Sequence, residues 1–188
     1  MEEKVDISVI GGGPAGIVSA VTARKYYPAK KISLMKDVEK GAIPCGIPYM
    51  FASLKSSDEN KLGNTSLEKN NIGVIVDEAI KIEQKEKVVV TETSKRYSYE
   101  KSILATGSSP IAPPIPGISK KGVYPIYKDM SYLKNSIEEI KKTKNVLIIG
   151  GGFIGVEFTD EISKIDNMNV YLVEFFPNLL ANSFDIIR

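Results

Sequence analysis

The segment VDISVIGGGPAG at residues 5–16 decides the fold of this chain. An apolar run leads into Gly11, Gly13 and Gly16, which are spaced as Gly-x-Gly-x-x-Gly, and a second apolar stretch follows. This order predicts a strand, a tight turn and a helix. Gly11 forms the turn, Gly13 leaves the backbone open to a pyrophosphate, and Gly16 lets the helix lie close to the strand. The N-terminus of the helix then faces the negative charge of the phosphates.

The same pattern occurs a second time, in NVLIIGGGFIG at residues 145–155. Gly150, Gly152 and Gly155 take the places of the three glycines in the first copy. Two such patterns predict two dinucleotide sites, or one site and one copy that has lost its ligand. Two ordinary strand-to-helix turns that bind nothing are the alternative.

The rest of the pattern predicts an α/β protein. Alternation with period two after residue 72 predicts a strand and a β-meander, and the prolines between Pro110 and Gly117 predict an extended linker. The expected strands are 4–10, 31–35, 72–76, 79–83, 87–91, 96–99, 101–107, 144–149 and 169–174. The expected helices are 14–27, a short one within 56–71, 129–143, and one that runs from the second glycine pattern to about 165.

Composition excludes several classes of function. The 188 residues carry a formal net charge of +2 with lysines interspersed among acids, so neither a nucleic-acid nor a membrane surface is indicated. The absence of histidine excludes Ser-His and Cys-His catalysis within this chain and removes the commonest metal ligand, so we expect no metal centre. Cys45 is the single cysteine, and we expect a cytoplasmic protein. Glu2 and Glu3 directly before the first strand do not resemble a signal peptide.

The single cysteine lies in GAIPCGIPYMF at residues 41–51. Pro44 before an apolar stretch predicts a helix that starts near Cys45, where a thiol is more reactive. A buried structural cysteine is the alternative, and the residues alone do not decide between the two.

A dinucleotide fold places an acid at the end of its second strand, where the acid binds the ribose hydroxyls. Glu174 follows Gly150 by 24 residues and fits this role. The same offset from Gly11 falls on Met35, which is not an acid. Asp37 lies two residues further on and could substitute if the strand end is displaced, although a solvent-facing turn residue is the simpler interpretation.

Four motifs stand in a characteristic order: GGGPAG, Cys-Gly-x-Pro-Tyr at Cys45, Ala-Thr-Gly before the proline cluster, and GGGFIGVE. Together they resemble the FAD- and NAD-dependent pyridine nucleotide-disulfide oxidoreductases, in particular the single-cysteine branch of coenzyme A-disulfide reductases, NADH oxidases and peroxidases. The resemblance covers nearly all of the chain. It implies a Rossmann-like FAD-binding domain with an inserted β-meander at 1–109, a linker at 110–125, and an incomplete Rossmann NAD-binding domain at 126–188.

The resemblance also assigns residues to the two cofactors. The implied FAD site consists of the first glycine turn, the end of the second strand and the Ala-Thr-Gly motif: Gly11, Gly13, Pro14, Ala15, Gly16, Met35, Lys36, Ala105, Thr106 and Gly107. The implied NADH site consists of the second turn and its acid: Gly150, Gly152, Phe153, Ile154, Gly155 and Glu174. An acid at Glu174 with no arginine beside it favours NADH over NADPH, because it would repel a 2′-phosphate.

The implied activity passes a hydride from NADH to FAD and electrons onward to Cys45. Tyr49 would supply a hydroxyl near the thiol, and Glu157 would lie near the nicotinamide and flavin, with a solvent-facing helix acid as the alternative. A lone cysteine needs a second reactant, so the acceptor would be a small-molecule disulfide, a persulfide or dioxygen. A ferredoxin or rubredoxin reductase that does not need Cys45, and a non-catalytic nucleotide-binding subunit, are the alternatives.

Several features depart from the family pattern. Met35 stands where the family has an acid, and Gly41 stands where this branch often has serine. Pro14 stands where the peroxidase and oxidase type has a histidine, which counts against peroxidase chemistry. The sequence also stops within the second domain. We therefore expect a fragment, a truncated reading frame or one part of a split protein, completed by a homodimer partner or a separate chain, that by itself binds FAD weakly and turns over poorly or not at all.

Overall fold

The computed structural model describes residues 2–181, so the end of the predicted second domain, 182–188, lies outside the described residues. The chain divides into two units, each with its own sheet and core. The first unit contains Met1–Gly41 and Leu62–Ser109, and the second contains Ala42–Lys61 and Pro110–Arg188. The sequence pattern does not indicate that Ala42–Lys61 belongs with the second unit. This segment belongs there because its apolar side chains pack against α3 and α4, as described below.

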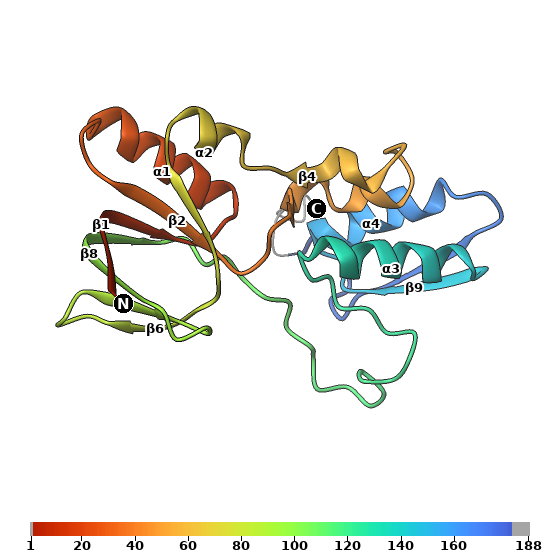
Figure 1. Ribbon diagram of the computed structural model, residues 1–188. Coiled ribbons are helices and arrows are strands. Elements are labelled where there is room, and N and C mark those ends of the chain that lie inside the picture. Colours follow the sequence, from red (N-terminus) through yellow and green to blue (C-terminus); the bar gives the residue numbers. More distant parts are fainter. Residues whose placement is uncertain (1, 182–188) are drawn as a thin grey trace. The chain divides into compact units, whose positions relative to one another are not determined.

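Six strands form one sheet in the first unit, in the order β5-β2-β1-β8-β7-β6; Figure 1 labels β2, β1, β8 and β6 of this sheet. They are β1 (Glu2–Ile10), β2 (Ile32–Lys36), β5 (Gly73–Val76), β6 (Ala79–Glu83), β7 (Val88–Thr91) and β8 (Arg96–Leu104). The first four in the spatial order run parallel, and β7 and β6 continue the sheet antiparallel, which confirms the predicted β-meander. The prediction of two strands at 96–99 and 101–107 is wrong, because β8 pairs with β1 on both sides of residue 100 and forms one strand that ends at Leu104.

The two faces of this sheet carry separate layers of apolar side chains. The helices α1 (Pro14–Tyr26) and α2 (Thr65–Lys69) cover one face (Figure 1). Proline at the first position of α1 is favourable because its fixed φ suits a helix start and its missing N–H would be unpaired there anyway. The core beneath these helices includes Val9, Ala20, Leu34 and Leu67, and the opposite face buries Ile10, Met35, Val89 and Tyr97.

The second unit has a two-stranded parallel sheet of β9 (Asn145–Ile149) and β10 (Asn169–Val173), with α4 (Phe153–Ser163) connecting them. The predicted helix over 129–143 is confirmed as α3 (Met130–Lys141), which Asp129 caps by accepting a hydrogen bond from the N–H of Tyr132 at 2.7 Å. No helix or strand lies between β8 and α3.

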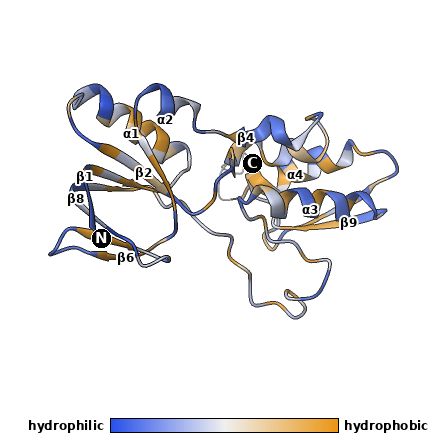
Figure 2. Ribbon diagram, viewed as in Figure 1, coloured by the Kyte–Doolittle hydropathy of each residue, from blue (hydrophilic) through white to orange (hydrophobic). Residues whose placement is uncertain are grey.

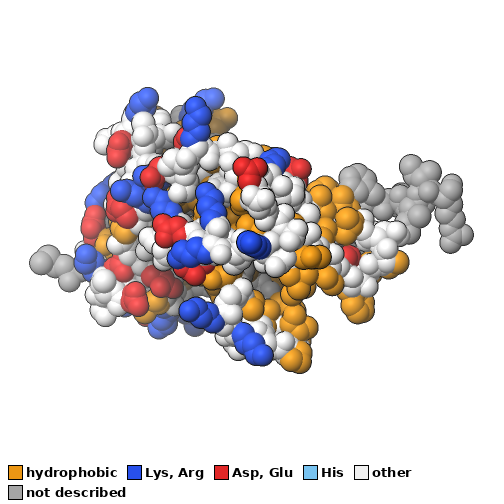
Figure 3. Space-filling view, turned by 90° about the vertical axis from the view of Figure 1, so that its right-hand side faces the viewer, with side chains coloured by type: hydrophobic (Ala, Val, Ile, Leu, Met, Phe, Trp, Pro, Cys, Tyr) orange, Lys and Arg blue, Asp and Glu red, His pale blue; other side chains and the backbone are white. Residues whose placement is uncertain are grey.

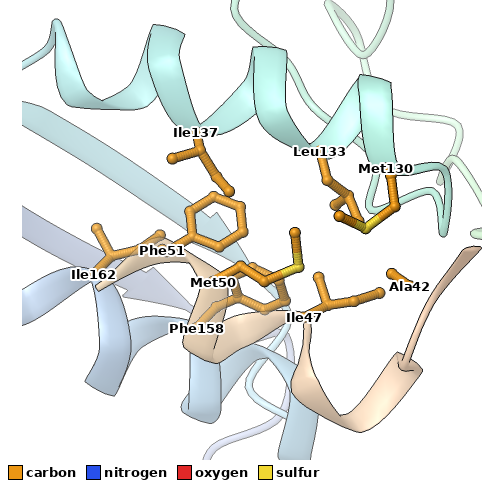
Figure 4. Close-up of a cluster of buried hydrophobic side chains, with 9 residues drawn as sticks. All are labelled: Ala42, Ile47, Met50, Phe51, Met130, Leu133, Ile137, Phe158 and Ile162. Atoms are coloured by element: carbon orange, nitrogen blue, oxygen red, sulfur yellow. The ribbon is translucent and has the colours of Figure 1, made fainter. Parts of the chain in front are cut away.

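The segment 42–61 supplies a third layer of this second core. It contains short 3₁₀ helices at Pro44–Gly46, Pro48–Phe51 and Ser57–Asn60, and the short strands β3 (Gly41–Ala42) and β4 (Lys61–Leu62) pair with each other. Its apolar side chains interlock with those of α3 and α4 (Figure 4). The cluster comprises Ala42, Ile47, Met50, Phe51, Met130, Leu133, Ile137, Phe158 and Ile162.

One face of the β9–β10 sheet is apolar but exposed. Leu147, Ile149, Tyr171 and Val173 are each more than half exposed, at 57%, 58%, 56% and 51%. Figure 2 shows the hydrophobic character of β9, and Figure 3 shows hydrophobic side chains reaching the surface among charged ones. Among the described residues, no helix is long and apolar enough to cross a membrane.

Candidate functional site

The first glycine turn has the geometry that a pyrophosphate requires. Gly11 has φ +118° and donates its N–H to the carbonyl of Met35 at 2.8 Å. A Cβ on Gly16 would lie 1.9 Å from the carbonyl oxygen of Gly11, so this close helix-to-turn contact requires glycine. A Cβ on Gly13 would meet nothing within 4 Å. The backbone at the N-terminus of α1 therefore faces open space, where a phosphate can approach.

The Ala-Thr-Gly motif lies beside this turn, as predicted. Ala105 donates its N–H to the carbonyl of Ile10 at 2.7 Å, and a Cβ on Gly11 would lie only 2.0 Å from the carbonyl oxygen of Ala105. Gly107 has φ +73° and redirects the chain after β8. The first turn and residues 105–107 therefore form one continuous backbone surface in the first unit, with Pro14 and Ala15 at the start of α1.

The second glycine turn repeats this geometry. Gly150 has φ +110° and donates its N–H to Val173 at 2.8 Å. A Cβ on Gly155 would lie 1.8 Å from the carbonyl oxygen of Gly150, whereas a Cβ on Gly152 would meet nothing within 4 Å. Phe153 and Ile154 begin α4 and are 56% and 67% exposed, so the first turn of this helix is open.

Glu174 lies directly against the second turn. Its carboxylate accepts hydrogen bonds from the backbone N–H groups of Gly151 and Phe176, the latter at 3.0 Å. These two bonds lower the pKa of Glu174, and the bond from Phe176 has the larger effect. The carboxylate is therefore ionised at neutral pH. A fixed anion at this position can accept hydrogen bonds from ribose hydroxyls.

The predicted counterpart of Glu174 in the first unit needs correction. The sequence offset pointed to Met35, but the strand registers pair Ile10 with Met35 and Ile149 with Val173, so Lys36 corresponds to Glu174. Met35 is 1% exposed and packs into the core on the far face of the sheet. The offset failed because the connection from turn to strand end is one residue longer in the first copy. Asp37 is exposed.

Cys45 lies within a one-turn 3₁₀ helix, one residue after its start at Pro44. The helix predicted to start near Cys45 is present as a short 3₁₀ helix, Pro44–Gly46, and Pro48 begins a second one, Pro48–Phe51. The thiol is free and exposed, so the alternative of a buried structural cysteine is wrong. A Cβ on Gly46 would lie 1.8 Å from Oδ1 of Asn60, so this buried asparagine braces the turn from behind.

A polar network that the sequence analysis missed fixes the Cys45 segment to α4. Glu161 is 1% exposed and accepts hydrogen bonds from the backbone and hydroxyl of Ser53 at 3.0 and 2.9 Å, and from Lys164 at 2.6 Å. Burial alone would raise the pKa of Glu161, but the bonds from Lys164 and Ser53 outweigh burial and lower it. Phe51 and Phe158 meet edge to face beside this network, with centroids 5.0 Å apart.

The three predicted catalytic residues all lie in the second unit. Cys45, Tyr49 and Glu157 are exposed, the first two on the segment 42–61 and the third on α4. The signal for Glu161 was present in the sequence, because it shares the helical spacing of the buried Phe158 and Ile162. The predicted approach of Cys45 to the first glycine turn, which belongs to the first unit, stays a prediction.

A cavity of about 780 Å³ occurs elsewhere in the first unit. Its lining comes from the connection before β2, from β5 and from the start of β8, and it includes Ser33, Ile75 and Tyr97 but no residue of the glycine turn. We therefore do not assign this cavity to a nucleotide.

The mixed six-stranded sheet and the two-stranded parallel sheet each carry a phosphate-accessible glycine turn at the carboxyl end of a parallel strand, β1 or β9, an arrangement typical of dinucleotide-binding proteins. The chain belongs to the pyridine nucleotide-disulphide oxidoreductase family, whose model matches residues 5–187. The members of this family use FAD and a nicotinamide nucleotide. The backbone at Gly13 and Gly152 fits a pyrophosphate. Only the ribose position of the first turn differs from the expected pattern, because it holds Lys36 and not an acid.

Individual relatives support the same assignment. The chain is 29% identical to an NAD(P)H coenzyme A polysulfide/persulfide reductase of Pyrococcus horikoshii over 97% of its length. It is 29% identical to an NADH oxidase of Methanocaldococcus jannaschii over 94% of its length. The structure of an NAD-dependent persulfide reductase from A. fulgidus matches 99% of this chain and 36% of that protein, with 26% identity and a TM-score of 0.84. The chain spans 42% of the length of both curated relatives.

Proposed function

We propose that this chain is the N-terminal part of an FAD-dependent NADH:disulfide or persulfide oxidoreductase, with Cys45 as the redox thiol. The observation that carries the proposal is the pair of glycine turns. Each is open at the second glycine of its Gly-x-Gly-x-x-Gly pattern, Gly13 or Gly152, and closed at the last, Gly16 or Gly155, which packs against the turn. We assign FAD to the first turn, where Ala105 and Thr106 add a second backbone contact surface, and NADH to the second.

In this proposal the chain's own residues bind the nucleotides and present the thiol. The cofactors, when bound, supply the two electrons. The thiolate of Cys45 attacks one sulfur of the acceptor, forms a mixed disulfide and releases the other sulfur as a thiolate; two electrons then break the mixed disulfide and restore Cys45. The exposure of Cys45 supports this role, because the acceptor must reach it. A thiol that cycles in this way fits the reducing cytoplasm, where we infer that the protein works.

The test uses FAD, NADH and a disulfide with matched variants. The wild-type chain should bind FAD weakly, measured as flavin absorbance that stays with the protein at saturating FAD, and anaerobic NADH should bleach this absorbance slowly. Gly13→Val should abolish FAD binding and Gly152→Val should abolish bleaching, since each fills the open space at one turn without meeting another atom. Cys45→Ser should keep the slow bleaching and lose the slow disulfide reduction. If Cys45→Ser reduces the disulfide as fast as wild type, the chain works as a direct electron transferase and the role of Cys45 is refuted.

We further infer a preference for NADH over NADPH at the second turn. Glu174 is held ionised by two backbone N–H groups, so a 2′-phosphate placed there meets a fixed negative charge. Glu174→Gln should reduce the preference for NADH by about tenfold, as expected when one charged contact is lost. Glu138→Gln, at an exposed site on α3, is the control for net charge. An unchanged ratio of the two dissociation constants in Glu174→Gln would refute this assignment.

We also propose that a further polypeptide segment completes both sheets. In the first unit β1 lies between β2 and β8, whereas β9 pairs only with β10 among the described strands. Beyond residue 98, β8 has β1 on one side and no β7 pairing on the other. Parallel sheets are normally covered on both faces, yet Leu147 and Tyr171 lie exposed on β9 and β10. The greater length of the relatives supports a segment that adds strands, either downstream or in a separate chain.

A further inference from the structure

The buried carboxylate of Glu161 holds the segment that carries Cys45 at two points. Oε2 of Glu161 accepts the backbone N–H of Ser53 at 3.0 Å, and Oε1 accepts the hydroxyl of Ser53 at 2.9 Å. Lys164 donates to the same Oε1 at 2.6 Å. Two donors of one residue thus meet two oxygens of one carboxylate. This contact, the Ser53–Glu161 clamp, fixes the orientation of the chain at Ser53 as well as its distance from α4.

Backbone hydrogen bonds carry this orientation from Ser53 to Cys45. They run from an N–H to the carbonyl of an earlier residue: Leu54 to Tyr49 at 2.9 Å, Met50 to Ile47 at 3.1 Å, and Ile47 to Pro44 at 3.2 Å. The apolar side chains of the segment pack against α3 and α4, whereas Cys45 and Tyr49 are exposed. The segment is therefore one hydrogen-bonded unit, with the thiol near one end and the clamp near the other.

Stability alone does not explain a carboxylate at this place. Replacing a buried charged contact by apolar residues of similar volume is often neutral or stabilising, so Glu161, 1% exposed, is weak evidence for stability. The neighbouring contact of Phe51 with Phe158 buries apolar area, which has no preferred direction and permits the segment to slide on α4. The hydrogen bonds of the clamp are directional and permit one placement only.

We propose that Glu161 is a positioning residue for Cys45: by clamping Ser53 at two points, it fixes the place of the exposed thiol relative to α4. The inference rests on the proposed redox role of Cys45 and names the residue that places this thiol. Without the clamp, the fold and the access of the acceptor remain, but Cys45 takes several positions. A misplacement of about 1 Å at a reacting group can cost about 100-fold in rate, so the placement of the thiol matters for its chemistry.

The experiment uses the single cysteine of the chain as the attachment point of a nitroxide spin label, so Cys45 reports its own segment. The wild-type spectrum should show restricted motion. Glu161→Gln replaces one accepting oxygen by an NH₂ donor and should shift the spectrum toward faster motion. Ser53→Ala removes the hydroxyl arm and should give a smaller shift in the same direction. Ile162→Val shortens a buried side chain of α4 outside the clamp, so it should lower stability without loosening the label.

A kinetic measurement at saturating FAD and NADH adds a second readout. Glu161→Gln should lower the kcat of the slow disulfide reduction about tenfold and change the KM for the disulfide by less than about twofold, because the acceptor still reaches an exposed thiol.

The outcomes separate this inference from the proposed function. If the label moves in Glu161→Gln as it does in wild type, or Ile162→Val loosens it equally, the positioning role is refuted while the redox role of Cys45 can still stand. If Cys45→Ser reduces the disulfide as fast as wild type, both proposals fail. The spectrum of Ser53→Ala, at an exposed residue, decides the matter if Glu161→Gln does not fold.

Discussion

At the scale of single residues, the glycines of each turn have two different tasks. Gly16 and Gly155 are needed for packing, because a Cβ at either would lie within 2 Å of a carbonyl oxygen of the same turn. Gly13 and Gly152 are free of such contacts and have φ near −75°, a conformation that any residue adopts. Stability and ligand binding should therefore respond to different glycines of the same motif.

Alanine substitution at the second turn tests this separation. Gly155→Ala should lower the free energy of unfolding by about 1–3 kcal/mol, because α4 must move away from the turn. Gly152→Ala should change stability by less than about 0.5 kcal/mol, the usual range for a site without close contacts, and should weaken NADH binding. Denaturant unfolding and a binding titration provide the two measurements. Equal losses of stability in both variants would contradict the division of tasks.

The turn that carries Cys45 depends on Gly46. Asn60 is held in place by hydrogen bonds from its Nδ2 to the carbonyl of Ile43 at 3.0 Å and to the sulfur of Met50 at 3.2 Å, so it cannot easily yield to a new Cβ. Gly46→Ala should lower stability by about 1–3 kcal/mol and change the rate of Cys45 alkylation by iodoacetamide. A Cβ on Gly63 would meet nothing within 4 Å, so Gly63→Ala is the matched control. Alkylation and unfolding that match wild type would show that Asn60 does not brace the turn.

At the scale of elements, Glu161 joins the Cys45 segment to α4 through a buried carboxylate. Its pKa is lowered on folding, so its contribution to stability is present above its ordinary pKa of 4.5 and is lost as the pH falls through the lower folded value. Glu161→Gln should cost about 1–3 kcal/mol at neutral pH, since the charge-assisted bonds from Ser53 and Lys164 are lost.

The same variant predicts a specific pH dependence. The difference in unfolding free energy between wild type and Glu161→Gln should be largest at neutral pH and shrink below pH 4.5, as the wild-type carboxyl takes up a proton. Glu138→Gln, at an exposed site on α3, should show little difference at either pH. A gap between wild type and Glu161→Gln that widens on acidification would mean that the carboxylate does not stabilise this contact.

At the scale of the whole molecule, the exposed apolar face of β9 and β10 should govern association. The doubly substituted chain Leu147→Lys, Tyr171→Lys should remain folded, since both side chains are more than half exposed. It should lose any concentration-dependent association that the wild type shows in sedimentation. If the doubly substituted chain associates as the wild type does, the contact lies elsewhere than on β9 and β10. If the wild type forms a stable dimer, the partner of this face is a second copy of the chain. Lys134→Gln, at a partly exposed site on α3, is the control.

Local pattern predicted much of this molecule. Periodicity and the glycine spacing gave both turns and their helices, and the extent of α3, because these features depend on neighbours within a few residues. The motif order also gave the family, since the spacing of Gly11, Gly13 and Gly16 is dictated by the local approach of a phosphate.

Other features depend on contacts between distant residues, and only the tertiary structure decided them. The registers of β2 and β10 show that Lys36, and not Met35, takes the place in the first unit that Glu174 takes in the second, because one extra residue in a connection shifts every alignment by offset. Likewise, the Cys45 segment belongs to the second unit because it packs against α3 and α4. The hydrogen bond between Ser53 and Glu161, 108 positions apart, is one of these contacts. Sequence spacing encodes what the backbone does locally, whereas packing between remote segments determines which side chain stands at a given point in space.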